Sequence, residues 1–249
     1  MRHAVVALLL GFSATAGAQE EEVRTGELEY GLVVDASSRY LFRGVPFSQE
    51  PVSQITAWAA LRGVTFYAWA NVLLEREPHQ NDFNELDFGA SYAYDFGKLT
   101  LEPGFDAYVF RVPAPRKAPH TIEGSIKVSY ALGPVAAFTR QTFDLAVNRG
   151  AYYAEAGLSF EHAPTQKISF SGALTFAWAS GQFNAGHIGV MDGGWNHVGI
   201  QLSLTYSPDE HFYLKPHFEL TSLAGSAFRQ HLEEPTVSSF GVAVGFFRD

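Results

Sequence analysis

The sequence predicts an all-β fold, an antiparallel up-and-down transmembrane β-barrel of about twelve strands. Three observations lead to this prediction. Hydrophobic residues recur at every second position, short and long connections alternate, and the polar face of each predicted strand carries mostly small residues with scattered charges. The composition agrees, because 47% of the 249 residues are hydrophobic and 14% aromatic, whereas 17% are charged and the mean hydropathy is −0.03.

The clearest alternation lies in residues 83–110, FNELDFGASYAYDFGKLTLEPGFDAYVF. In its first half, Leu86 and Phe88 fall on one face, and Asp87 and Gly89 fall on the other. Period two is the strand period, because successive side chains leave a pleated strand on opposite sides. In a soluble sandwich the aromatic face would be buried in a core. In a membrane barrel it would face lipid, and the acidic face would line a lumen.

Residues 1–18 have the features of a secretory signal peptide. The chain begins with the basic MRH, continues with the apolar residues 4–12, and has a small-x-small cleavage motif, AGA, at residues 16–18. We therefore expect residues 19–249 to form the barrel. After residue 20 no apolar run approaches the roughly 20 residues that a membrane-spanning helix needs.

Alternation predicts the strands one after another along the chain. The first, at residues 30–42, places Tyr30 and Leu32 opposite Gly31 and Asp35. The complete set is 30–42, 52–61, 64–74, two strands within 83–110, 122–132, 135–145, 152–160, 168–178, 198–206, 212–220 and 240–246. This is an even number, as in bacterial single-chain barrels.

The connections between these strands alternate in length. Short turns are predicted at Arg62-Gly63, Phe96-Gly97, Gly133-Pro134, 163–165 and 208–210, and longer loops at 44–49, 75–82, 112–120, 180–194 and 223–235, with a short hairpin at Asn148. Short turns on one side and long loops on the other are typical of outer-membrane barrels. Aromatic residues near strand ends resemble the girdles of such barrels; examples are Tyr92, Tyr94, Trp178 and Tyr206. Together these features favour the membrane barrel over a soluble fold.

The first predicted hairpin resembles a known family. Residues 38–45, SRYLFRGV, then Gln54, then residues 63–71, GVTFYAWAN, resemble the TorF-like porins of proteobacterial outer membranes. The chain has Ala68 and Ala70 where that family has Gly and Ser, and it ends on charged residues rather than on an aromatic one. The resemblance covers about the first fifth of the mature chain. It implies an outer-membrane, porin-like barrel and no particular solute.

The polar faces of the predicted strands place charged residues in the lumen. Our candidates for the pore lining are Asp35, Arg39, Arg43, Glu102, Asp106, Lys127 and Arg140. Such charges bias ion permeation in a water-filled pore, so we predict a passive channel for small polar solutes or ions. The excess of acids predicts a mild cation preference. Alternatively, the charges pair across strands and fill a narrow barrel, which would then have an envelope-structural or interaction role.

A lipid-modifying barrel enzyme is a third hypothesis, since a lipid hydrolase needs a Ser–His pair. His217 is the only histidine on a predicted strand, its position in the alternation turns it away from lipid, and no serine lies in a recognisable nucleophile motif. We therefore predict no catalytic residue. The histidines of the long loops show no metal-ligand spacing, and we predict no metal and no cofactor.

The net charge of −9, without a basic tract, argues against nucleic acid as a partner. The expected location is the bacterial outer membrane. The expected partners are its lipid, lipopolysaccharide and small polar solutes. Arg116 and Lys117, in a proline-rich loop, are candidates to contact lipopolysaccharide phosphates.

Overall fold

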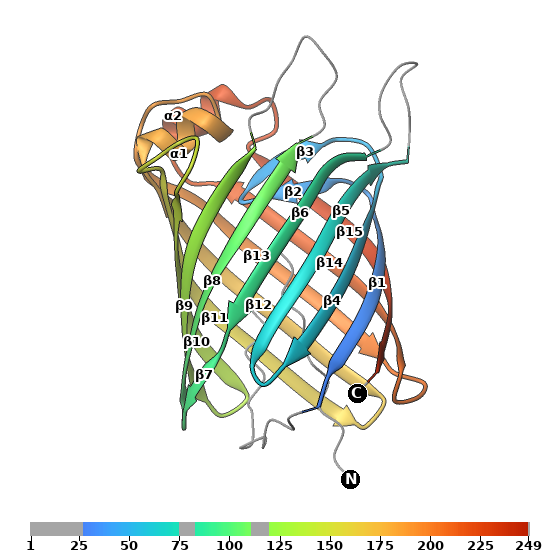
Figure 1. The fold of residues 1–249 in the computed structure, drawn as a ribbon. Helices are drawn as coiled ribbons and strands as arrows, with labels where there is room; N and C mark the ends of the chain where they lie inside the picture. Colours follow the sequence, from blue (N-terminus) through green and yellow to red (C-terminus); the bar gives the residue numbers. More distant parts are fainter. Residues whose placement is uncertain (1–26, 75–82, 111–119, 249) are drawn as a thin grey trace.

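The structure is a computed structural model that describes residues 27–74, 83–110 and 120–248. These residues form a closed antiparallel barrel of 12 strands (Figure 1). The predicted signal peptide and the loop with Arg116 and Lys117 lie outside the described residues. The barrel strands are β1 (Glu29–Ser37), β4 (Val52–Leu61), β5 (Val64–Leu73), β6 (Phe83–Tyr92) with its continuation β7 (Tyr94–Phe96), β8 (Leu99–Phe110), β9 (Thr121–Leu132), β10 (Val135–Asp144), β11 (Tyr152–Thr165), β12 (Ile168–Ala179), β13 (Gly194–Tyr206), β14 (Phe212–Leu223) and β15 (Thr236–Arg248).

Closure depends on two pairings. Strands β6 and β7 both pair with β8, so they act as one strand, and β1 pairs with β4 on one side and with β15 on the other. The opposition of Tyr30 and Arg248 in the β1–β15 ladder brings the two ends of the strand series together. Every described strand edge of the sheet is therefore paired, which removes the open edges that a membrane does not tolerate.

The barrel is apolar outside and polar inside. Phe66 is 59% exposed and Phe240 is 68% exposed, whereas Lys127 and Glu155 are 6% and 7% exposed. A water-soluble protein has the opposite distribution. Because the large apolar side chains point outward from the closed sheet, the prediction of a transmembrane barrel with an inverted pattern is confirmed.

The two ends of the barrel differ. We call the end at which β1 begins and β15 ends the turn end, since the short connections gather there, and the opposite end the loop end (Figure 1). At the turn end, Tyr92 and Tyr94 have ring centroids 4.2 Å apart. At the loop end, Tyr152 packs on Trp178 with centroids 5.6 Å apart. Aromatic residues thus mark both ends of the apolar surface, as expected for the two interfaces of a bilayer.

Glycines in the wall accommodate aromatic rings of the neighbouring strand. A Cβ at Gly89 would lie 2.1 Å from the ring of Tyr67, which is directly opposite on β5. The same relationship holds for other opposed pairs, among them Gly31 with Trp58, Gly157 with Phe138, and Gly245 with Tyr213. Each ring therefore lies over a glycine of the wall.

The predicted strand at residues 30–42 is wrong in its second half. Strand β1 ends at Ser37, and residues Tyr40–Phe42 form β2, which pairs with β3 (Val45–Ser48) in a separate hairpin. Tyr40, which the alternation from Tyr30 onward would turn outward, is only 4% exposed. The reason is local: Arg43 and Gly44 have φ values of 49° and 84°, the two positive angles of a tight hairpin turn.

Other boundaries differ less. The loop predicted at 180–194 contains α1 (Gly181–His187), which begins where Ser180 accepts a hydrogen bond from the Phe183 amide, and the loop at 223–235 contains α2 (Ser226–His231). No described helix is long and apolar enough to span a membrane. Strand β13 begins at Gly194 rather than at residue 198, and β11 continues through the predicted turn at 163–165 with a register irregularity.

Candidate functional site

The β2–β3 hairpin packs with the loop segments that carry α1 and α2. An apolar cluster joins the three segments; its buried members are Val45, Ile188, Leu223 and Phe228, with Val190 and Leu232 packed against them. The hairpin is also tied to the wall, since the Ser38 amide donates to the Phe240 carbonyl at 2.9 Å. We call this assembly of hairpin, α1 and α2 the loop-end cap, and it holds the hairpin tip in place.

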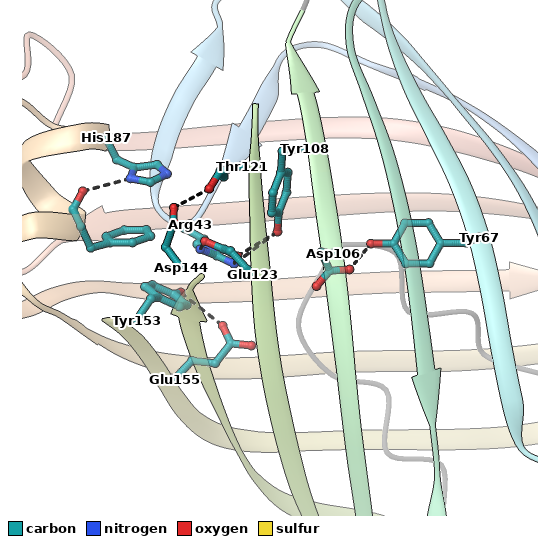
Figure 2. Close-up of polar contacts among 11 residues, drawn as sticks. Arg43, Tyr67, Asp106, Tyr108, Thr121, Glu123, Asp144, Tyr153, Glu155 and His187 are labelled. Carbon is teal, nitrogen blue, oxygen red and sulfur yellow. Dashed lines mark hydrogen bonds and ion pairs between the residues drawn. The ribbon is translucent and has the colours of Figure 1, made fainter. Parts of the chain in front are cut away.

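Arg43 occupies that tip and binds the wall. Its Nη1 and Nη2 atoms donate to the two carboxylate oxygens of Glu123 on β9, at 2.9 Å and 2.5 Å. The Tyr108 hydroxyl donates to Glu123 Oε2 at 3.1 Å (Figure 2). The side chains of Arg43 and Glu123 are 13% and 5% exposed. Bidentate charge-assisted hydrogen bonds fix the geometry of both partners, and separating them would leave a buried charge without compensation, so Arg43 fastens the hairpin to β9.

Aromatic rings complete the surroundings of Arg43. The guanidinium carbon lies 4.7 Å from the ring centroids of both Phe42 and Tyr153, and 5.4 Å from that of Phe183. His187 of α1 stacks on Phe183 with centroids 3.9 Å apart. A guanidinium over ring faces gains cation–π attraction, more so where water is excluded. The rings therefore hold the cation in one position.

The surroundings of the α1 histidine favour its neutral form. Nδ1 of His187 lies 2.9 Å from the Phe183 carbonyl oxygen, and because that oxygen can only accept, Nδ1 carries the proton. Burial lowers the pKa of His187 below its ordinary value, and the nearby positive charge of Arg43 acts in the same direction.

Gly44 lets the hairpin tip approach the wall. A Cβ at this position would lie 2.5 Å from the ring of His197 on β13, so any side chain would collide with it. His197 in turn contacts Asn196 Oδ1 through Nδ1 at 2.8 Å, and Asn196 donates to the Asn184 side chain of α1 at 2.6 Å. The hairpin tip thus lies between Glu123 on β9 and His197 on β13.

Below the tip, one wall of the lumen is densely charged. Asp106 accepts a hydrogen bond from the Tyr67 hydroxyl (Figure 2). Lys127 is directly opposite Glu102 on β8 and directly opposite Arg140 on β10. Arg140 interacts electrostatically with Glu155, Asp106 and Glu102, while its Nε has no hydrogen-bond partner among the described residues. We call this surface, on strands β6 to β11, the charged wall.

The other wall presents small side chains. Its inward residues on β12, β13 and β15 include Ser171, Ala173, Thr175, Ala177, Gly199, Ser203, Ser239, Gly241 and Ala243. The hydroxyls of Ser171 and Ser203 lie 2.7 Å apart. We call this surface the small-residue wall. Strand β14 lies between β13 and β15 and turns Lys215, His217 and Glu219 toward the same lumen. Small side chains therefore line β12, β13 and β15, while charged ones line both β14 and the charged wall.

The structure brings five of the seven predicted pore-lining residues together. Arg43, Glu102, Asp106, Lys127 and Arg140 all belong to the Arg43 site or to the charged wall.

The other two predicted residues lie elsewhere. Asp35 accepts hydrogen bonds from Ser37 Oγ at 2.9 Å and lies 3.0 Å from Nε2 of His217 on β14. Arg39 pairs with Glu234 of the loop after α2 at 2.9 Å, and both side chains are partly exposed. Arg39 is therefore a residue of the barrel rim and not of the charged wall.

Several residues of the site were not predicted. Glu85 is 3% exposed on the inner face of β6, and the tyrosines that bind lumen carboxylates, Tyr67, Tyr108 and Tyr153, were assigned no role. The alternation places these residues on the inner face of their strands, and this signal is present in the sequence. The contribution of Phe183 and His187 had no such signal, because both come from a helix in a segment without periodicity.

No group of three or more histidine and carboxylate side chains in the described part of the chain is placed to hold a metal ion. Ser37, Asp35 and His217 are adjacent, but their order is not that of a hydrolase. Asp35 lies between the hydroxyl and the imidazole, so His217 does not contact the Ser37 hydroxyl as a general base would.

Solved structures with a similar fold are outer-membrane channels. The NanC porin matches with a TM-score of 0.58 and 12% identity, over 86% of this chain and 98% of that one. An outer-membrane channel from Pseudomonas putida F1 matches with 0.57 and 8%, over 94% and 100%. The KdgM porin matches with 0.54 and 10%, over 88% and 98%. The sequence matches no family model and no curated protein. At these identities the likeness is one of fold.

Proposed function

We propose that this chain is a porin-like channel of the bacterial outer membrane that lets small polar solutes or ions pass passively, with a mild cation preference. The observation that carries the proposal is the polar, charged interior of a closed barrel whose exterior is apolar. Membership of the TorF-like porins, suggested by residues 38–71, and export by a cleaved signal peptide at residues 1–18 belong to the same proposal. Because the long loops of outer-membrane barrels lie on the outer side, the loop end would face the outside of the cell.

The small side chains of β12, β13 and β15 support a path for solutes. They leave more room than the long side chains of the charged wall, so a hydrated solute would pass along the hydroxyls of these strands and near the charges of β14 and the charged wall. The proposed pore lining retains Asp35, Glu102, Asp106, Lys127 and Arg140, with Arg43 at the loop end and Arg39 at the rim.

Carboxylates outnumber cationic side chains in this lumen, which supports the cation preference. The inward acids are Asp35, Glu85, Asp87, Glu102, Asp106, Glu123, Asp144, Glu155, Glu161 and Glu219, and the inward bases are Arg43, Lys127, Arg140 and Lys215. One KdgM porin structure is described as a complex with oligogalacturonate. That solute carries many carboxylates, and the acidic lumen here disfavours a cargo of this kind.

A closed barrel with an envelope-structural or interaction role is the second candidate. The Arg43–Glu123 ion pair and the loop-end cap favour it, since they fix the first hairpin between β9 and β13. A lipid-modifying enzyme is disfavoured by the position of Asp35 between Ser37 and His217.

Liposome swelling separates these candidates. The purified protein is reconstituted in liposomes that are then diluted into isosmotic solutions of neutral sugars of increasing size. A channel produces swelling with small sugars that declines as the sugar grows. Swelling no faster than that of protein-free liposomes, for every sugar, would favour the closed barrel.

A further inference from the structure

A groove on the lipid-facing surface carries polar side chains that the channel function does not use. It has a volume of about 400 Å³ and lies over strands β10 to β13. Its floor is formed by Ala154 and Ala156 of β11. The side chains on its two sides are Thr139 and Gln141 on β10, and Phe176, Trp178 and Trp195 on β12 and β13. Directly below Ala156 on the same face, Leu158 is 49% exposed, so the groove ends in the apolar belt.

The polar groups of the groove form a directed chain of hydrogen bonds. The Tyr152 hydroxyl donates to Gln141 Oε1, Gln141 Nε2 donates to Thr139 Oγ1 at 2.7 Å, and Thr139 donates to the Glu155 carbonyl at 2.9 Å. This order fixes the orientation of the Gln141 amide. One N–H of that amide has no partner among the described residues. The groove therefore offers a hydrogen-bond donor to lipid, and its complement is an acceptor such as an acyl carbonyl.

The depth of this donor suits a lipid carbonyl. Gln141 lies three residues before the end of β10 at the loop end, a distance of about 10 Å along a strand. The aromatic residues Tyr152, Trp178 and Trp195 surround the same level and mark the interface. Acyl carbonyls of a bilayer lie just below its head groups, so a carbonyl at Gln141 leaves its chain to run over Ala154 and Ala156.

The connection at the loop end of the groove contains a cationic residue. Arg149 belongs to the short connection between β10 and β11, and Asp144 fixes this connection by accepting from the amides of Ala146 and Asn148 at 2.9 and 3.1 Å. Arg149 is exposed, and of its side-chain nitrogens only Nε donates a hydrogen bond to a described residue, at 3.3 Å to the Leu145 carbonyl. Its Nη atoms have no protein partner within the described part of the chain, so they remain free to bind an anionic head group.

We propose that this groove binds lipid A, the acylated and phosphorylated anchor of lipopolysaccharide. An acyl chain lies over Ala154 and Ala156, an acyl carbonyl accepts from Gln141, and a phosphate binds Arg149. This requires the loop end to lie in the outer leaflet, as the proposed function assumes, but it does not require a conducting lumen.

The test measures retained lipid by native mass spectrometry of the purified protein after incubation with bisphosphoryl lipid A or with phosphatidylethanolamine. The groove is filled by Ala156→Phe, and Ala57→Phe on the lipid-facing side of β4 is the matched control. We expect one lipid A retained by the wild type and by Ala57→Phe, and a loss of about tenfold in Ala156→Phe. Arg149→Gln should weaken bisphosphoryl lipid A and leave phosphatidylethanolamine unchanged.

Three outcomes would overturn the proposal. One is equal retention of lipid A by the two phenylalanine variants. Another is retention of phosphatidylethanolamine as strong as that of lipid A, which would indicate ordinary bilayer lipid. The third is a dimer that Ala156→Phe abolishes, which would assign the groove to a second copy of the chain. Each result is independent of liposome swelling, so failure here and failure of the channel are distinguishable.

Discussion

Arg43 at the tip of the first hairpin and Glu123 on β9 form a bidentate ion pair, with N–O distances of 2.9 and 2.5 Å. The pair joins a segment that precedes the second barrel strand to a strand 80 residues further along the chain. Because both side chains are largely shielded from water, each charge depends on the other for compensation. The pair therefore acts together with the apolar cluster of the loop-end cap in fixing the hairpin.

Replacing Arg43 should release the hairpin. In Arg43→Asn the carboxylate of Glu123 remains buried without its partner, which costs about 3–5 kcal/mol, and the tip moves away from β9. We expect larger single-channel conductance than in the wild type, measured in planar bilayers. Asparagine tolerates the positive φ of this position. Arg62→Asn is the matched control, because Arg62 has the same conformation, with φ 50°, in an Arg-Gly turn at the turn end. Equal conductance in the two variants would refute the role of Arg43.

Neutralising a base of the charged wall should increase the cation preference. Lys127 is 6% exposed and faces the lumen. Loss of one unit charge near the ion path changes the energy of a passing ion by about 1 kcal/mol, or about fivefold in permeability ratio at most. Reversal potentials in a KCl gradient measure this ratio for Lys127→Gln. The same substitution at Lys98, exposed at the turn end, should have little effect. A shift toward anions in Lys127→Gln would contradict the assignment.

Adding a methyl group at Gly89 should destabilise the barrel. Its Cβ would lie 2.1 Å from the Tyr67 ring, and overpacking of this kind typically costs about 1–3 kcal/mol. Urea unfolding in lipid vesicles, followed by tryptophan fluorescence, measures the loss. At Gly199, also on the inner face, no atom lies closer than 3.8 Å to the added Cβ, so Gly199→Ala should change stability by less than about 0.5 kcal/mol. Equal stability of the two variants would show that the ring over Gly89 is not a constraint.

Acidification should loosen the loop-end cap through His187. Burial lowers the pKa of this side chain below 6.5 in the folded cap, so the opened cap binds the proton more readily. Stability is therefore complete above about pH 6.5 and declines as the pH falls below it. Hydrogen exchange of the Ile188 amide, which donates to the Asn184 carbonyl at 2.7 Å, should be faster at pH 5 than chemical exchange alone predicts. His187→Phe keeps the stacking and should lose this excess; an unchanged excess would place its cause elsewhere.

The fold could be predicted because a barrel strand is a local pattern. The alternation of Leu86, Phe88 and Ala90 with Asp87 and Gly89 shows which face meets lipid without knowledge of any partner strand. The alternation of short and long connections then distinguishes the turn end of the barrel from its loop end. The two boundaries that differ have different causes. At residues 38–42 alternation continues although the segment pairs in a separate hairpin, whereas at 163–165 strand β11 continues through a segment predicted as a turn.

The site could be predicted only in part. Inward charges follow from the alternation, so the inward positions of Asp106, Lys127 and Arg140 could be predicted. The contact of Arg43 with Glu123 depends on the hairpin turning inward, which alternation does not show. The Arg43-Gly44 pair was an available signal, since Arg62-Gly63 has the same sequence and forms the same type of turn. The rings of Phe183 and His187 come from a short helix with no periodic signal of its own.

Single-channel recording of the wild-type protein in planar bilayers, with a tenfold KCl gradient across the membrane, tests the central claim most directly. A channel with this acid-rich lumen predicts discrete current steps and a reversal potential displaced modestly toward the potassium equilibrium potential. The absence of steps at any protein concentration, or a reversal potential displaced toward the chloride equilibrium potential, would contradict it.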